Sequence, residues 1–368
     1  MSAMSHDLSR YHRQVLLPGF GEEGQRRLLD STALVLGCGA LGSLIADLLA
    51  RAGVGRLVIV DRDLIELTNL QRQLLFDEHD VADTIPKAEA ARRRLARINS
   101  QVEVTAVVDD VNYRNIEKYA AGANVIVDGL DNFETRYLAN DFAVKFGAPY
   151  IYGGAVGTVG SALAILPHTR GQNAPWETLA GGSRATPCFR CLFEEAPPPG
   201  MNPTCDTSGV MAPAVGIVAS FQAAEALKVL TGNFDRVCPT MLNMDIWGNE
   251  FAQLKVARAY ELGDCPCCKH GCFEYLDGRL GSAATTLCGR DAVQLTHGQN
   301  AGAVDLKEIA VRLRAHGRVA ESPFMIRADI ADGGKPYVLS IFPDGRAIVH
   351  GTAEAGIARG VFAKYVGI

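Results

Sequence analysis

The stretch GCGALG spans residues 37–42 and connects an apolar run to a helix-like segment. Gly37 allows a tight turn, Gly39 allows close backbone approach and Gly42 lets the helix pack near the strand. The first amides of the following helix can then bind a phosphate. Asp61 ends the next apolar run, where a carboxylate can bind ribose hydroxyls. This pattern alone suits NAD and ATP equally well.

The loop that follows Asp61 is rich in charged and amide side chains. Its candidate site residues are Asp63, Asn69, Gln71, Arg72 and Gln73. Lys87 comes directly after Pro86, at the start of a predicted helix. An enzyme that breaks the α–β bond of ATP needs cations near the phosphates, because charge builds on the leaving pyrophosphate. A hydride-transfer site has no such need, so the loop favours ATP over NAD.

Six of the ten cysteines fall in two short clusters. In a chain without a recognisable secretory signal, clustered cysteines indicate metal binding or catalysis rather than disulfides. Two CxxC pairs suit a tetrahedral structural Zn²⁺. The pairs are Cys188 with Cys191 and Cys265 with Cys268. Cys267 and Cys272 remain alternatives for the second pair.

Cys205 ends a long loop just before the predicted helix over 210–230. A helix N-terminus lowers the pKa of a thiol, so Cys205 is a candidate nucleophile. A loop cysteine without a role is the alternative.

The composition describes an ordinary globular chain of 368 residues, with 48% hydrophobic and 21% charged residues. A net charge of −5 argues against nucleic acid as the main partner. The N-terminal segment has no apolar core typical of a signal peptide. The apolar stretch 210–230 contains Pro213, Glu225 and Lys228, which indicates a buried helix rather than a membrane span. We therefore expect a cytoplasmic protein.

Strand-like and helix-like segments alternate through the first part of the chain, which predicts a doubly wound, Rossmann-like α/β fold with a mostly parallel sheet. Two short helices within 8–31 should break at Pro18-Gly19. The predicted strands are 32–37, 56–61, 102–108, 149–157 and two within 239–256, with a further strand that runs into a polar turn over 123–132. The predicted helices are 41–54, 87–99, 133–147 and 210–230.

We expect a domain boundary within 263–281, which separates a domain of residues 1–270 from a small α+β module of residues 275–368. The module should contain, in order, a strand over 286–295, a helix over 305–317, a strand over 322–330, a hairpin around Pro343-Asp344-Gly345 and a closing helix. The segment LCGRDAVQ lacks the spacing of a rhodanese active loop, so we expect the module to bind a carrier or partner instead.

Several motifs resemble those of the ThiF/MoeB/HesA family, the bacterial relatives of ubiquitin-activating enzymes. They are RYHRQVLLPGFGEEGQ, GCGALGS, AGVGRLVIVDRDLIELTNLQRQ, PKAEAA, GLDNFETR, CFRC and GVMAPAVGIVASFQAAEALKVLTG, within about residues 8–268. The resemblance implies ATP-dependent adenylation of the C-terminal glycine of a ubiquitin-like sulfur carrier ending in Gly-Gly, with release of pyrophosphate. The family's turn commonly reads GxGGLG, and this chain has Ala40 in place of a glycine.

The resemblance also implies roles for individual residues. Asp131 matches the acid that binds Mg²⁺, and Arg13 matches an arginine that reaches the partner's ATP across a homodimer interface. Cys205 matches a cysteine that in some members forms a thioester or exchanges a persulfide. The implied nucleotide site comprises Gly37, Gly39, Ala40, Gly42, Asp61, Asp63, Asn69, Gln71, Arg72, Lys87, Asp131 and Asn132. Arg13, Asn69, Arg72, Lys87, Asp131 and Cys205 are the implied catalytic residues.

Two other functions remain open at this stage. An NAD-dependent oxidoreductase would need a hydride-transfer pocket, for which we find no motif. A non-catalytic scaffold subunit of a heterodimer has no reason to keep the full set of charged residues. The sulfur donor should act in trans, as a cysteine desulfurase or a rhodanese. The carrier would serve thiamine, molybdopterin, cysteine or tRNA sulfur chemistry.

Overall fold

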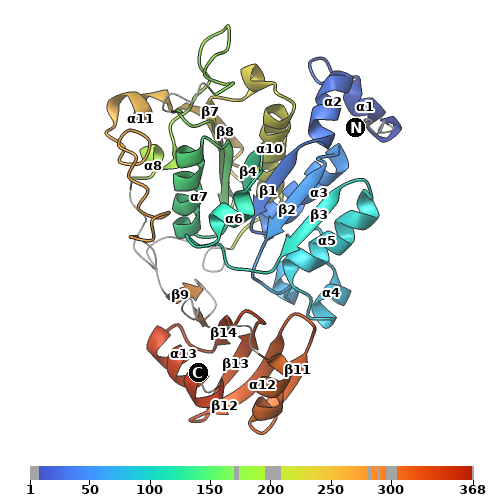
Figure 1. Ribbon diagram of the computed structural model, residues 1–368, viewed down its shortest axis with the longest axis vertical. Helices are drawn as coiled ribbons and strands as arrows, with labels where there is room; N and C mark the ends of the chain where they lie inside the picture. The colour runs from blue at the N-terminus through green and yellow to red at the C-terminus, as the bar shows by residue number, and fades with distance from the viewer. Residues whose placement is uncertain are drawn as a thin grey trace. The chain divides into compact units, whose positions relative to one another are not determined.

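The computed structural model describes residues 8–169, 174–194, 209–280, 284–287, 291–295 and 305–366 (Figure 1). The chain divides into two compact units. The first comprises Met1–Pro198 and Val210–Leu280, and the second comprises Pro199–Gly209 and Gly281–Ile368.

The first unit is built on an eight-stranded sheet with the order β3-β2-β1-β4-β5-β6-β7-β8. The strands from β3 to β5 are parallel to their neighbours, and β5 to β8 pair antiparallel. The strands are β1 Thr32–Leu36, β2 Arg56–Val60, β3 Glu103–Val107, β4 Val125–Asp128, β5 Tyr150–Val156, β6 Val159–Ile165, β7 Thr240–Asp245 and β8 Glu250–Lys255. The predicted Rossmann-like α/β fold is confirmed.

Helices cover both faces of this sheet, and each face has its own apolar core. One core includes α3, α5 and α10, and the other includes α6 and α7. All five residues of β1 are buried because the strand lies between the two layers. The helices are α1 His12–Val15, α2 Gly21–Leu29, α3 Ala40–Ala52, α4 Glu78–Ala82, α5 Lys87–Ile98, α6 Ile116–Ala120, α7 Phe133–Phe146, α8 Phe189–Leu192, α10 Ala212–Leu230 and α11 Ala257–Leu262, with 3-10 turns η1 Ser9–Tyr11, η2 Leu67–Asn69 and η3 Phe234–Arg236.

Helix α10 is long and apolar enough, at 19 residues, to cross a membrane. It packs against the sheet instead, and its buried side chains belong to the same core as those of α3. Its low amphipathicity follows from this central position, as predicted from the sequence.

Strand β6 was not predicted. It follows β5 after a turn at Gly157-Thr158, where Gly157 has a φ of 61°. Its residues are mostly small, and the β-branched residues that usually mark a strand occur only at its ends, as Val159 and Ile165. Pairing with β5 and β7 makes it a strand.

The second unit has a six-stranded antiparallel sheet with the order β11-β12-β13-β14-β10-β9. Helices α12 and α13 share one apolar core with this sheet. The predicted hairpin is confirmed, since Gly345 donates its amide to Phe342 O at 3.0 Å. The elements are β9 Ala284–Leu287, β10 Ala292–Leu295, α12 Leu306–Leu313, β11 Gly317–Glu321, β12 Ile326–Asp332, β13 Lys335–Ile341, β14 Ala347–His350 and α13 Ala355–Val366.

One strand and the end of one helix differ from the prediction in this unit. The single strand expected over 286–295 is an antiparallel pair, β9 and β10. The helix expected over 305–317 ends at Leu313, and a turn connects it to β11, which begins at Gly317.

Candidate nucleotide site and metal centre

The glycine turn joins β1 to α3 and leaves no room for side chains at two of its positions. Gly37 has a φ of 84°, and a Cβ there would lie 2.6 Å from Gly129 O. A Cβ at Gly42 would lie 1.9 Å from Gly37 O. Gly39 occupies the N-cap position of α3, and no side chain caps this helix. The first amides of α3 are therefore available to an anion. Ala40 is the first residue of α3, where a helical backbone accepts alanine readily.

Asp61 follows β2 and fixes the turn from the neighbouring strand. Its Oδ2 accepts from Cys38 N at 2.6 Å, and its Oδ1 accepts from Asp63 N at 2.7 Å. Burial raises the pKa of Asp61, and the nearby Lys87 ammonium opposes that shift. One carboxylate thus holds both the glycine turn and the start of the polar loop.

Lys87 is the first residue of α5 and lies 3% exposed beside the polar loop. Its Nζ donates to Asp63 Oδ2 at 2.9 Å, and its backbone N donates to Asp63 O at 2.9 Å. Residues 24 positions apart in sequence therefore form one compact charged group next to the glycine turn.

The polar side chains in and after η2 differ in how much of each is exposed to solvent. Asn69 is 1% exposed and its Oδ1 accepts from Glu66 N at 3.0 Å, which closes the turn. Arg72 is half-buried, and its Nη1 donates to Thr68 O at 2.9 Å. Gln71, predicted in the nucleotide site, is exposed. The side chain of Gln73 is the buried one.

Gln73 lies against the glycine turn. A Cβ at Gly39 would lie 3.9 Å from Gln73 Nε2. Gln73 Oε1 is buried without a hydrogen-bond partner among the described residues. A buried polar atom without a partner is costly, so its position beside the turn fits a site that is completed by a ligand.

Asp131 and Asn132 follow β4 and differ in role. Asn132 Oδ1 accepts from Thr135 N at 2.9 Å and caps α7, so its carbonyl is used by the helix. Asp131 is exposed and available to a cation. Burial lowers the pKa of the Arg62 guanidinium. The carboxylates of Asp110, Asp63 and Asp131 raise it by more, so the net shift is upward.

Arg62 was not predicted as a site residue, although it stands between the two predicted acids Asp61 and Asp63. Its Nη1 lies 2.7 Å from Asp110 Oδ1, so it joins the ends of β2 and β3. Its position just after the predicted strand over 56–61 could have marked Arg62 as a site residue.

Arg13 is not close to this site in the same chain. Arg13 lies exposed on α1. The next residue of this helix, Gln14, donates its Nε2 to Ala52 O at 2.9 Å. Ala52 is the last residue of α3, whereas the glycine turn precedes the first. Figure 1 shows α1 and α4 at opposite ends of α3 and α5. A helix of 13 residues is roughly 20 Å long, so Arg13 is separated from the turn by about that distance.

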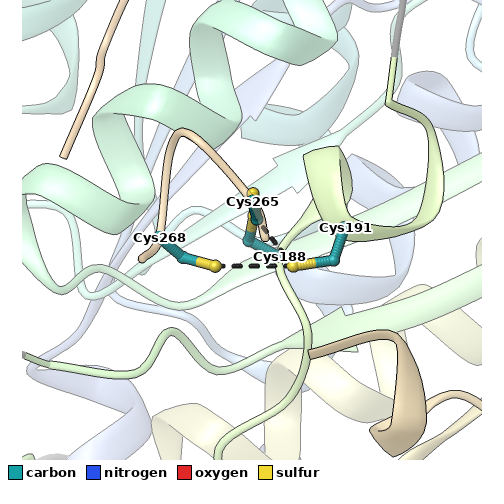
Figure 2. A group of neighbouring side chains, drawn as sticks. All are labelled: Cys188, Cys191, Cys265 and Cys268. Carbon is teal, nitrogen blue, oxygen red and sulfur yellow. Dashed lines mark hydrogen bonds between the residues drawn. The ribbon is translucent and has the colours of Figure 1, made fainter. Parts of the chain in front are cut away.

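Four cysteine sulfurs meet at the second candidate site (Figure 2). Cys188 and Cys191 come from the start and the body of α8, and Cys265 and Cys268 come from the loop after α11. The sulfur–sulfur distances are 3.8 Å for Cys188–Cys191, 3.6 Å for Cys188–Cys265 and 3.4 Å for Cys191–Cys268. A Zn–S bond of about 2.3 Å places the corners of a tetrahedron about 3.8 Å apart, so the set fits Zn²⁺.

The group of four sulfurs includes Cys265 and Cys268 and neither of the alternatives for the second pair. Cys267 is fully buried and its sulfur accepts from Asn140 Nδ2 at 3.4 Å, outside the group of four. Cys272 is half-buried and does not belong to that group either. Cys205, the candidate nucleophile, lies outside the described residues.

Together these groups are chemically suited to a phosphorylated ribose ligand. Free amides at α3 offer contacts for phosphate, and acids from β2 and β4 offer contacts for ribose hydroxyls and a cation. Lys87 and Arg72 supply positive charge.

Comparison with known proteins gives consistent matches. The profile of the ThiF family matches residues 11–267. The chain is 41% identical over 359 residues to the sulfur carrier protein ThiS adenylyltransferase of Bacillus subtilis (strain 168), across 97% of this chain and 99% of that protein. A protein of the same name from Escherichia coli (strain K12) is 35% identical over 71% of this chain and 95% of its own length. The crystal structure of E. coli MccB with ATP matches in fold, with a TM-score of 0.56 at 23% identity over 71% of this chain and 75% of that chain.

Proposed function

The chain belongs to the ThiF family, and from that premise we propose that it is an ATP-dependent adenylyltransferase for a ubiquitin-like sulfur carrier protein. The match to the B. subtilis relative along nearly the whole of both chains carries this proposal. The carboxylate of the carrier's C-terminal glycine attacks the α-phosphorus of ATP. The bond from the α-phosphorus to the bridging oxygen breaks, which yields carrier acyl-adenylate and pyrophosphate.

The attacking carboxylate is ionised at pH 7, so the enzyme needs no general base. Its task is to hold two anions in line and to mask their repulsion. The α3 amides and Gln73 bind around the phosphates, and Asp61 binds the ribose. Lys87 and Arg72 would offset the charge that develops on the leaving pyrophosphate.

Asp131 is the residue that would hold Mg²⁺, because it is an exposed carboxylate in the loop after β4, two residues beyond Gly129, whose backbone touches the glycine turn. When bound with ATP, the ion supplies further neutralisation of the triphosphate. The four thiolates of Cys188, Cys191, Cys265 and Cys268 would hold a structural Zn²⁺. Four protein ligands leave no open position for catalysis.

Arg13 acts on the partner's ATP in a homodimer. Support comes from the separation of roughly one α3 length between α1 and the glycine turn of the same chain. The test mixes Arg13→Ala chains with Lys87→Ala chains, each inactive alone. Hybrid dimers carry one intact site and should recover part of the activity, whereas absence of recovery would show that Arg13 acts within its own subunit.

The second unit holds the carrier or a downstream partner, and the sulfur arrives from a cysteine desulfurase or a rhodanese in the cytoplasm. The E. coli relative supports a role outside adenylation, because it bears the same name and aligns with only 71% of this chain. A truncation after Leu280 respects the division between the two units. Unchanged carrier affinity and sulfur transfer in that variant would refute the role.

The decisive experiment is ATP–pyrophosphate exchange with the purified protein and candidate carriers ending in Gly-Gly. Exchange that depends on one carrier would establish adenylation and identify the pathway. ATP binding without exchange for any carrier would favour a scaffold subunit. Binding of NAD in place of ATP would favour an oxidoreductase.

A further inference from the structure

A fully buried carboxylate ends β4, one residue before the loop that carries Asp131. Asp128 Oδ2 accepts from Arg136 Nε at 3.1 Å and from Tyr150 OH at 2.7 Å. Its Oδ1 accepts from Leu130 N at 2.8 Å. Asp128 is 0% exposed, so this group does not touch bulk solvent or bind a ligand directly.

The arginine of this group holds the same loop from its other side. Arg136 lies in the first turns of α7 and is 7% exposed. Its Nη2 donates to Leu130 O at 2.7 Å and to Gly153 O at 3.2 Å. Both the amide and the carbonyl of Leu130 are therefore bound by the Asp128–Arg136 pair.

The loop of residues Gly129–Asn132, here named the acid loop, is also in contact with the glycine turn. A Cβ at Gly129 would lie 2.5 Å from Gly37 O and 2.8 Å from Gly42 Cα. The two backbones therefore touch without side chains between them. Any displacement of the acid loop is transmitted to the residues that approach the phosphates.

A buried ion pair contributes little to stability compared with apolar residues of similar volume. It does impose direction, because each carboxylate oxygen and each guanidinium nitrogen accepts only a narrow range of partner positions. The partners here are the backbone groups of the acid loop and the adjacent strand β5.

We propose that Asp128, Arg136 and Tyr150 are positioning residues, which hold the acid loop against the glycine turn so that Asp131 faces the phosphates. This inference rests on the proposed function for the chemistry at Asp131, but the geometry of the loop can be tested separately. None of the three residues is itself catalytic.

The test compares two Tyr→Phe variants of the full chain. Tyr150→Phe removes the hydroxyl that binds Asp128. Tyr137→Phe is the matched control, since Tyr137 is also 0% exposed and its OH donates to Phe193 O at 3.0 Å, away from the acid loop. Amide hydrogen exchange of peptides covering Gly129–Asn132 should accelerate roughly tenfold in Tyr150→Phe, as expected for loss of one bond to a charged group. The control should leave these peptides unchanged.

Activity supplies the second readout. The Mg²⁺ concentration for half-maximal ATP–pyrophosphate exchange should rise several-fold in Tyr150→Phe, and further in Arg136→Lys, while Tyr137→Phe behaves as wild type. Unchanged loop exchange in Tyr150→Phe, or an equal change in Tyr137→Phe, would overturn the inference. If Arg136→Lys does not fold, Tyr150→Phe decides. A wild-type protein without pyrophosphate exchange would refute the proposed function, and amide exchange of the loop would still decide the positioning role.

Discussion

Replacing Gly129 with alanine should slow adenylation roughly ten- to hundred-fold. Gly129 has no unusual backbone conformation that requires glycine, so the effect would come from the added methyl group alone. That methyl carbon would lie 2.5 Å from Gly37 O, 2.8 Å from Gly42 Cα and 3.0 Å from Gly42 N. All three atoms are backbone, and none can swing aside as the end of a flexible side chain can.

The size of the effect follows from the shift that the contact requires. The distance from the added Cβ to Gly37 O would have to grow by 0.5 Å to reach 3.0 Å, below which real Cβ contacts are essentially never found. It would have to grow by 0.9 Å to reach an ordinary contact of 3.4 Å. The glycine turn and the acid loop must separate by that amount. Misplacement of reacting groups by about 1 Å can cost roughly 100-fold in rate, which corresponds to about 2.7 kcal/mol in the activation free energy.

The assay is carrier-dependent ATP–pyrophosphate exchange, measured together with the melting temperature. Gly216→Ala is the matched control, because Gly216 lies on α10 and an added Cβ would meet no atom within 4 Å. This control should keep full activity and equal or greater stability, since alanine favours a helix. A folded Gly129→Ala protein that exchanges pyrophosphate within about twofold of wild type would refute the reasoning that the two backbones set the site geometry.

Three further outcomes are expected. Cys268→Ser should lose most of its bound zinc by metal analysis and melt at a lower temperature, whereas full zinc content would make Cys267 the fourth ligand. Lys87→Met removes the 2.9 Å ion pair with Asp63 but leaves Arg62, whose Nε lies 3.8 Å from Asp63 Oδ1, so it should destabilise the protein by about 2 kcal/mol in urea titration. A change below about 0.5 kcal/mol would contradict the contribution of the Lys87–Asp63 pair. Iodoacetamide should spare Cys38 in the native protein, because burial raises its pKa, and labelling of the folded protein there would contradict that burial.

Local patterns were sufficient for most elements of the first unit. The strand–turn–helix of β1 and α3 was predictable because the apolar run, the glycines and the helical periodicity lie next to one another in sequence. Strand β6 was missed for the opposite reason. Its small residues form a strand through pairing with β5 and β7, and β7 lies more than 70 residues further along the chain.

The positions of the charged residues at strand ends were likewise readable. Asp61, Asp63 and Lys87 follow recognisable elements, and the ends of parallel strands meet at one edge of a sheet. The choice between Gln71 and Gln73 was not readable, because it depends on how the loop turns over Gly39. Neither was the spatial separation of Arg13 from the site of its own chain.

The sequence by itself determined the fold class, the glycine turn, the charged loop and the two cysteine clusters, because the residues of each lie close together in the chain. Tertiary structure alone decided which four sulfurs converge and which buried side chains bind the backbone of Leu130, next to Asp131. Cys188 meets Cys265 across 77 positions, and Tyr150 meets Asp128 across 22. Such contacts form only when the sheet and helices are packed, because buried polar atoms then pair with residues that are distant in the sequence.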